Sequence, residues 1–125
     1  MSLSEYLAAI RDEIERLDSY GFAESVEFHE ELRAGKQAII KVEVVLVNGS
    51  TLRIREYIDA RYSIEKVSYA YHLQGREGNL VFRYDNAVHK PALDFPEHKH
   101  TADGPVIQAA SPDMKSLLDE VISYL

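Results

Sequence analysis

The hydrophobic positions of the first segment repeat every three or four residues, which is the period of an amphipathic α-helix. The repeat consists of Leu3, Leu7, Ile10, Ile14 and Leu17. Ser2 and Glu5 have the spacing of a capping box, which satisfies the first backbone N–H groups of a helix. Gly21 is a residue type that commonly follows a helix end. The pattern predicts a helix over residues 3–20.

From residue 22 the hydrophobic positions alternate with polar ones, which is the period of a half-buried β-strand. The alternating segments cover about 22–32, 37–47, 51–58, 67–74 and 80–85. Asn48-Gly49 joins the second segment to the third and is a strong hairpin signal, since both residue types tolerate a positive φ. Because the connections are short, we predict an antiparallel meander of about five strands.

The last segment returns to the helical period. Its apolar stripe consists of Met114, Leu117, Leu118, Val121 and Ile122. Ser111 is suited to cap this helix, Pro112 to occupy its first position, and Asp113 to interact with the positive end of its dipole. Residues 85–104 show neither period, so we predict a long loop there. A loop of this length in a compact domain is usually functional or disordered.

Together these elements predict a single α+β domain over residues 1–125, a length that suffices for one hydrophobic core. We expect the N-terminal and C-terminal helices to pack on the apolar face of the sheet. Glu56 is an exception to the pattern, because it falls on the apolar side of its segment.

The other face of the predicted sheet gathers positive charge. If the strands pair in chain order, side-chain alternation places four candidates on it: Arg53, Arg55, His72 and Arg83. One interpretation is a surface that holds a phosphate backbone. The alternative is a solvated face with cross-strand ion pairs. Their acidic partners would be Glu27, Glu31 and Glu43.

The overall composition narrows the class of protein. The net charge of −7 argues against a protein that coats nucleic acid through its total charge, although it permits a local basic patch. The chain has no cysteine, so it forms no disulfide, and we expect a cytoplasmic location. No apolar run approaches the roughly 20 residues that span a bilayer, so no membrane partner is expected.

Residues 83–100 hold more groups able to move protons or bind anions than any other stretch. Three of the five histidines lie there: His89, His98 and His100. Histidine titrates near neutral pH, so it can take a proton from a 2′-hydroxyl of RNA or give one to a leaving oxygen. Arg83 and Lys99 are suited to stabilise the charge that builds on the phosphate.

Two other interpretations of this stretch remain open. Asp85 and the three histidines offer one oxygen and three nitrogen ligands, which suit zinc or another transition metal. The histidines can instead serve only to satisfy backbone groups of the loop, with Asp85-Asn86 capping a turn.

The motif Arg83-Tyr84-Asp85-Asn86-Ala87-Val88-His89, followed by Phe95-Pro96-Glu97-His98-Lys99-His100, resembles the signature of the TumE family. Members of this family are small proteins regarded as toxin components of type II toxin–antitoxin pairs. They are typically encoded beside an antitoxin that has a helix-turn-helix DNA-binding domain. The resemblance therefore implies a toxin with such an antitoxin as its partner, and it implies a genetic role more firmly than a reaction.

From the residues and the resemblance together, we predict a toxin that acts on RNA as a metal-independent ribonuclease. The catalytic candidates are His89, His98, His100, Arg83 and Asp85. The substrate-binding candidates are Lys99, Arg53, Arg55, His72, Tyr84 and Asn86. No cofactor is expected, and homodimerisation is possible. The alternatives are a non-catalytic module whose histidine-rich loop shapes a partner-protein interface, and an enzyme that uses a divalent metal at the histidine cluster.

Overall fold

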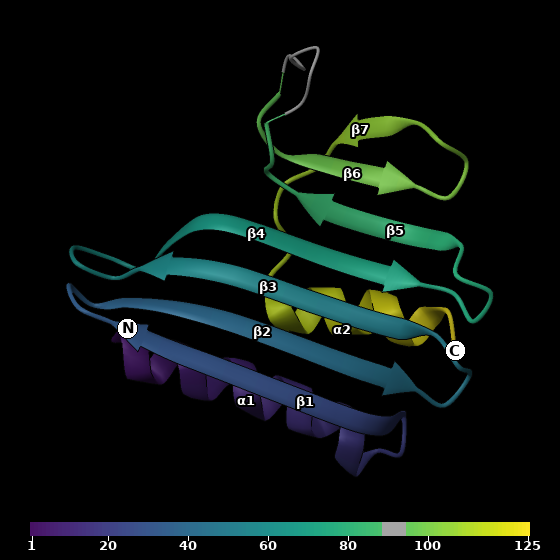
Figure 1. Ribbon diagram of the computed structural model, residues 1–125, viewed down its shortest axis with the longest axis horizontal. Coiled ribbons are helices and arrows are strands. Elements are labelled where there is room, and N and C mark those ends of the chain that lie inside the picture. The colour runs from purple at the N-terminus through teal and green to yellow at the C-terminus, as the bar shows by residue number, and fades with distance from the viewer. Residues whose placement is uncertain (89–94) are drawn as a thin grey trace.

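The computed structural model describes residues 1–88 and 95–125. In this part of the chain there are two helices and seven strands. Their order is α1 (Leu3–Ser19), β1 (Ala23–Arg33), β2 (Gln37–Leu46), β3 (Thr51–Asp59), β4 (Glu65–Gln74), β5 (Leu80–Asp85), β6 (His98–Thr101), β7 (Val106–Gln108) and α2 (Met114–Ser123). Every strand pairs antiparallel with its neighbour in the chain, so the sheet order is β1 to β7 (Figure 1). The predicted α+β class and antiparallel meander are confirmed.

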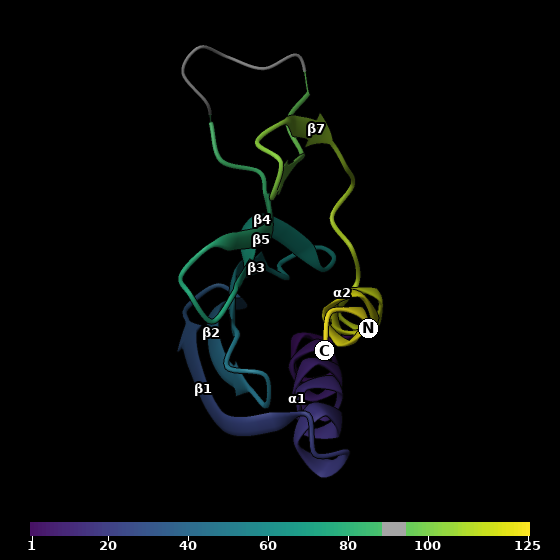
Figure 2. The same cartoon turned by 90° about the vertical axis from the view of Figure 1, so that its right-hand side faces the viewer.

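Both helices lie on the same side of the sheet, as predicted (Figure 2). The stripe of α1 buries Leu7, Ile10, Ile14 and Leu17. The stripe of α2 buries Leu117, Leu118 and Val121. These side chains meet the apolar residues of β2 to β5 in one core cluster. Neither helix of the described residues covers the opposite face of the sheet, which leaves that face open to a ligand.

The predicted strand number of about five is too low: β6 lies within residues 85–104, where the sequence analysis placed a loop, and β7 lies between that segment and α2. These strands have four and three residues. Segments this short give no readable hydrophobic alternation, and the residues of β6 are all polar. β6 is defined by its pairing with β5, through the partners Asp85↔His98 and Arg83↔His100, and β7 is defined by its pairing with β6.

Local signals set the ends of the elements. The capping box of Ser2 and Glu5 is present at the start of α1. The N-cap of α2 is Asp113, whose side chain accepts a hydrogen bond from the Ser116 N–H at 2.8 Å. Ser111 was the expected cap. Its N–H instead donates to Glu97 Oε2 at 2.7 Å, which holds it outside the helix.

The hairpin predicted at Asn48-Gly49 joins β2 to β3. Only Gly49 has a positive φ, of 85°, whereas the sequence analysis allowed a turn with two such residues. The Asn48 side chain accepts hydrogen bonds from Ser50, including one from its N–H at 3.0 Å. This turn fixes the register of β2 against β3, and hence which side chains of the two strands lie opposite each other.

That register continues through the sheet and sets two neighbouring rows of side chains at the centre of the uncovered face. The first row consists of Glu27, Glu43, Arg53, His72, Arg83 and His100. The second row consists of His29, Lys41, Arg55, Ala70, Asp85 and His98. The expectation that the arginines of β3 and β5 share this face with His72 is confirmed. We call this surface, from Lys41 and Arg53 across to His100, the cationic face.

Glu56 occupies the position on the covered face that the alternation indicated. It is 1% exposed, and the hydroxyl groups of Tyr6 and Tyr71 both donate hydrogen bonds to its carboxylate. Lys66 Nζ lies 3.8 Å from Glu56 Oε2 and also donates to Ser111 Oγ at 2.5 Å. This buried polar cluster therefore ties both α1 and the segment before α2 to the sheet.

Candidate functional site

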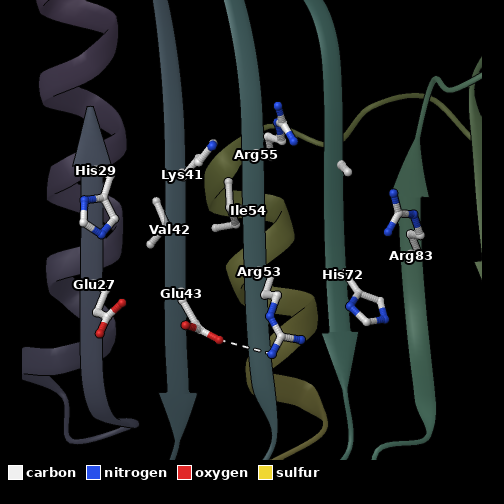
Figure 3. A pocket seen from close by; sticks show the side chains of 11 residues that line it. Glu27, His29, Lys41, Val42, Glu43, Arg53, Ile54, Arg55, His72 and Arg83 are labelled. Carbon is white, nitrogen blue, oxygen red and sulfur yellow. Dashed lines mark ion pairs between the residues drawn. The ribbon is translucent and has the colours of Figure 1, made fainter. Parts of the chain in front are cut away.

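The cationic face is hollowed into an open depression of about 430 Å³ over β1 to β5 (Figure 3). Its positively charged or titratable lining residues include Lys41, Arg53, Arg55, His72 and Arg83. Ala70 lies between Arg55 and Asp85 in its row, and its short side chain leaves space there. Cationic side chains therefore surround a position that has no long side chain of its own.

Acidic residues occur at the β1 and β2 end of the first row and only partly neutralise the cations. Arg53 pairs with Glu43 at 3.2 Å, and both side chains are nearly half exposed. An exposed pair of this kind contributes little and is readily exchanged for another anion. Among the ion pairs of residues 1–88 and 95–125, none involves Lys41 or Arg55. Those two cations are available to an added phosphate.

His72 has a distinct electrostatic environment between Arg53 and Arg83. Partial burial, followed by the charges of Arg83 and Arg53, lowers the pKa of His72 below the ordinary 6.5. Burial and like charge both disfavour the protonated ring. The imidazole of His72 is therefore neutral at neutral pH, with one nitrogen able to accept a proton.

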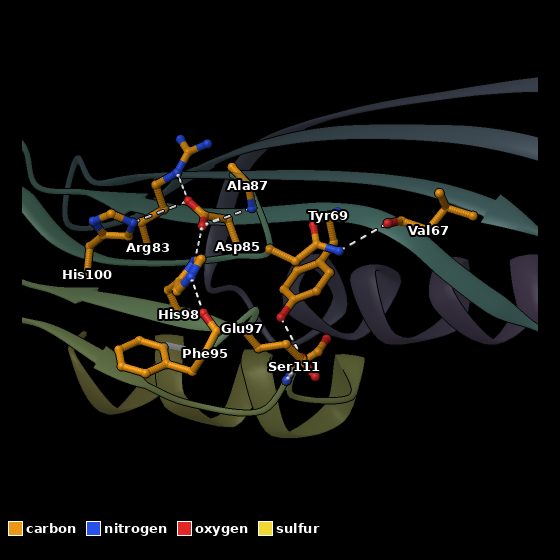
Figure 4. A network of polar contacts seen from close by, with 11 residues as sticks. Val67, Tyr69, Arg83, Asp85, Ala87, Phe95, Glu97, His98, His100 and Ser111 are labelled. Carbon is orange, nitrogen blue, oxygen red and sulfur yellow. Dashed lines mark hydrogen bonds and ion pairs between the residues drawn. The ribbon is translucent and has the colours of Figure 1, made fainter. Parts of the chain in front are cut away.

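Asp85 is the centre of a second group of residues, at the β5 and β6 side of the cationic face (Figure 4). Its side chain is 4% exposed. Arg83 Nε donates to Oδ2 at 2.8 Å, His98 Nδ1 lies 3.2 Å from Oδ1, and His100 Nε2 lies 3.4 Å from Oδ2. Burial raises the pKa of Asp85, but the hydrogen bonds from Arg83 and His98 and the charge of His100 outweigh it and hold this pKa below its usual value. Asp85 is therefore ionised at neutral pH.

The two histidines beside Asp85 have different accessibility. His98 is 2% exposed, and its Nε2 lies 2.7 Å from the carbonyl oxygen of Phe95, so both ring nitrogens face oxygen acceptors. The Phe95 ring packs against it with centroids 5.5 Å apart. The side chain of His100 is 24% exposed. His98 thus holds Asp85 in place, whereas His100 keeps part of its side chain exposed while its Nε2 is buried beside Asp85.

The structure brings together four of the five predicted catalytic residues: Arg83, Asp85, His98 and His100. The fifth, His89, lies outside the described residues. Of the predicted substrate-binding residues, Arg53, Arg55 and His72 join the same face. The other three do not line that face, and each has a contact that supports the fold.

Tyr84 and Lys99 lie on the helix-covered side of the sheet. The Tyr84 hydroxyl donates to Glu120 Oε1 at 2.6 Å, and Lys99 Nζ donates to Glu120 Oε2 at 2.8 Å. Lys99 Nζ also lies 4.9 Å from the centroid of the Tyr84 ring. Since Glu120 belongs to α2, this arrangement anchors the helix to β5 and β6.

Asn86 attaches the end of β5 to the neighbouring strand. Its side chain donates to the Val67 carbonyl at 3.0 Å and accepts from the Tyr69 N–H at 3.1 Å, so it satisfies two backbone groups of β4. We expect Asn86→Ala to lower the free energy of unfolding by about 1–2 kcal/mol, because both backbone groups lose their partners. Urea unfolding followed by circular dichroism measures this loss. Asn86→Asp can still accept from the Tyr69 N–H, so its free energy of unfolding should fall by less. If both variants lose the same stability, the two hydrogen bonds do not contribute separately.

Sequence reasoning did not single out Lys41, Ala70 or Glu120. The hairpin signal at Asn48-Gly49 could have found Lys41, because that turn places it opposite Arg55. No comparable signal exists for Glu120, whose partners depend on how α2 packs. In the described part of the chain, no group of three or more His, Asp or Glu side chains is arranged to hold a metal ion.

Fold and site define an α+β domain whose open sheet face carries a cationic depression beside a buried aspartate–histidine–arginine network. Comparison with protein families identifies the class more closely: the model described as Toxin TumE matches residues 9–125. The chain belongs to the TumE toxin family, as the motif in residues 83–100 indicated. No curated protein and no solved structure matches the chain. Neither helix in residues 1–88 and 95–125 has the length and apolar character needed to cross a membrane.

Proposed function

We propose that this TumE-family protein is the toxin of a toxin–antitoxin pair and cleaves RNA by acid–base chemistry that needs no metal. One observation carries the proposal: Arg53, His72, Arg83 and His100 occupy directly paired positions on four successive strands. Such a row combines cations that attract phosphate with rings that exchange protons near neutral pH.

The residues have different roles in this proposal. Lys41, Arg53 and Arg55 attract the RNA backbone, and Arg83 stabilises the charge that develops on the reacting phosphate. His100 exchanges a proton with the substrate. Asp85 is a positioning residue, because its carboxylate is buried and orients Arg83 and His100. A cytoplasmic location agrees with RNA as the substrate.

Membership of the TumE toxin family suggests a protein antitoxin as the partner. We propose that this partner carries a helix-turn-helix domain, as the motif resemblance implies. An antitoxin that neutralises a ribonuclease would need to cover the cationic face or block access to it. Its acidic side chains would replace the phosphates there.

The test is cleavage of single-stranded RNA by the purified chain in the presence of a chelator. We expect His100→Ala to slow cleavage by about 10²–10⁴-fold, the usual contribution of a positioned acid or base. Lys115→Ala removes an exposed cation on α2, where Lys115 pairs with Asp119 at 3.0 Å, and should cleave at the wild-type rate. Thermal unfolding of each variant shows whether it is folded. Growth arrest on induction without any RNA cleavage would contradict the ribonuclease proposal.

A non-catalytic binding module is the second candidate, and the burial of His98 favours it. A ring whose nitrogens both face oxygen acceptors within the protein can serve structure alone. This candidate predicts that the wild-type chain binds RNA or an antitoxin but leaves RNA intact. Loss of cleavage with the chelator and recovery on adding a divalent metal would instead support the metal-dependent alternative.

A further inference from the structure

Two histidines flank Arg83 on the cationic face, and both lie in the same row. The backbone partners are His72↔Arg83 between β4 and β5, and Arg83↔His100 between β5 and β6. Neighbouring strands lie about 4.8 Å apart, so the two histidine backbones are separated by about twice that distance. A phosphate bound to Arg83 would therefore have one imidazole on each side.

Arg83 has donors available for such a phosphate. Its ion pair with Asp85 uses Nε. Figure 4 shows the two terminal nitrogens directed away from the Asp85 carboxylate. Figure 3 shows the guanidinium at the side of the depression, on the strand next to that of His72. Arg83 is therefore held by Asp85 through Nε, while its two terminal nitrogens face the open side of the sheet.

The two imidazoles have opposite electrostatic surroundings. Asp85 lies 3.4 Å from His100, and a carboxylate at that distance favours a positive charge on the ring. His72 faces Arg53 and Arg83, and burial with these charges lowers the pKa of His72. A ring held against a carboxylate is suited to act as a general acid, and a ring placed between two guanidinium groups is suited to act as a general base.

We propose that His72 and His100 are the general base and general acid of an RNA transesterification at a phosphate held by Arg83. His72 takes the proton of the 2′-hydroxyl, and the 2′-oxygen forms a bond to phosphorus. The bond from phosphorus to the 5′-oxygen breaks, and His100 gives its proton to that leaving oxygen. The products are a 2′,3′-cyclic phosphate and a 5′-hydroxyl. The inference rests on the proposed ribonuclease function and adds to it His72 as a second catalytic residue.

The space over the row agrees with this substrate. Ala70 leaves the position between Arg55 and Asp85 without a long side chain, next to His72 and Arg83. A nucleotide can approach the row there, while Arg55 contacts the adjacent phosphate. Because the reaction uses the 2′-hydroxyl as nucleophile, DNA of the same sequence should bind without being cut.

The first experiment identifies the product ends and the pH dependence of cleavage by the full chain. We expect cyclic phosphate ends and a rate that rises and then falls between about pH 5 and 9. The rising limb reports the base, so His72→Ala should flatten it; the falling limb reports the acid, so His100→Ala should flatten that one. Each variant should be slowed by about 10²–10⁴-fold. An RNA with a single 2′-deoxynucleotide at the cleavage position should stay intact.

The second experiment separates the two roles through the leaving group. An RNA whose 5′-bridging oxygen is replaced by sulfur expels a thiolate, which needs no proton donor. His100→Ala should cleave it at close to the wild-type rate, whereas His72→Ala should remain slow. A merely structural role of either histidine would not produce this split. Lys115→Ala is again the control, and it should match the wild type on both substrates.

The outcomes distinguish the two proposals. Cleavage that leaves 5′-phosphate ends, or wild-type cleavage by His72→Ala, would overturn the histidine pair and leave the ribonuclease function standing. Rescue of His72→Ala by the sulfur-containing substrate would reverse the assigned roles and so overturn the inference. Absence of any RNA cleavage by the wild type would contradict the ribonuclease function itself.

Discussion

Asp85→Ala is expected to abolish RNA cleavage and growth arrest and to lower the free energy of unfolding by about 3–5 kcal/mol, because it breaks a buried charged network. The carboxylate is almost fully buried, and it contacts Arg83 at 2.8 Å, His98 at 3.2 Å and His100 at 3.4 Å. In the variant, the buried His98 ring loses its contact with the carboxylate, and Arg83 and His100 lose the group that orients them. Urea unfolding and RNA cleavage, measured on the same preparation, give both effects.

Asp85→Asn is the matched control, since an amide keeps the shape and one oxygen but loses the charge. The pKa of Asp85 in the folded chain is below the ordinary 3.8, so its charge stabilises the fold fully above that ordinary value. This stabilisation is lost as the pH falls through the lower, folded-state pKa. We therefore expect the wild type to exceed Asp85→Asn in stability at neutral pH, and the difference to vanish in acid. If the difference in stability between wild type and Asp85→Asn does not change with pH, the charge of Asp85 does not stabilise the fold.

The uncovered face was predictable from the sequence because two independent rules agreed on it. Alternation of apolar and polar residues fixed which side of each strand faces the helices. The turn at Asn48-Gly49 fixed the register of β2 against β3. A shift by one residue would bury Arg53 and Arg55, so the apolar pattern excludes it. The placement of His72 and Arg83 follows by the same reasoning.

The sequence indicated that residues 83–100 form a cluster of functional groups, but it did not indicate which side of the sheet each side chain faces. Its histidines and Lys99 are neighbours in the chain, yet β6 turns Lys99 toward Glu120 of α2 and His98 and His100 toward Asp85. This separation requires a strand, and four polar residues do not reveal one. Which His ring is buried depends on Phe95 and the packing of β5, and these are tertiary contacts that local patterns do not encode.

The TumE motif therefore combines two structural tasks in one strand pair. Arg83, Asp85 and His100 form the network on the open face, and Tyr84 and Lys99 hold α2 on the covered face. Because successive residues of a strand point to opposite sides, both tasks fit within adjacent positions. The motif is contiguous because its residues lie on β5 and β6, the two strands that connect the site to the core.

The buried cluster around Glu56 provides the second large effect, and it is independent of the site. Glu56→Ala is expected to lower the free energy of unfolding by about 3–5 kcal/mol, because it leaves Lys66 without its buried counter-charge. The hydroxyl groups of Tyr6 and Tyr71 also lose their acceptor. Burial, together with the charge of Glu56, raises the pKa of both tyrosines, so both remain protonated donors at neutral pH.

A double-mutant cycle with Lys66→Met separates the charge pair from the tyrosine hydrogen bonds. Removing the ammonium group first should make the later loss of Glu56 less costly, by the coupling of about 0.5–3 kcal/mol that contacting residues show. Urea unfolding followed by circular dichroism measures all four chains, since the protein has no tryptophan to report by fluorescence. Glu56→Gln should lie between wild type and Glu56→Ala, because an amide oxygen can still accept from one tyrosine. If the losses of stability for Glu56→Ala and Lys66→Met are additive, the two groups, 3.8 Å apart, do not stabilise the fold as a pair. The cost of Glu56→Ala would then come from the lost hydrogen bonds of Tyr6 and Tyr71.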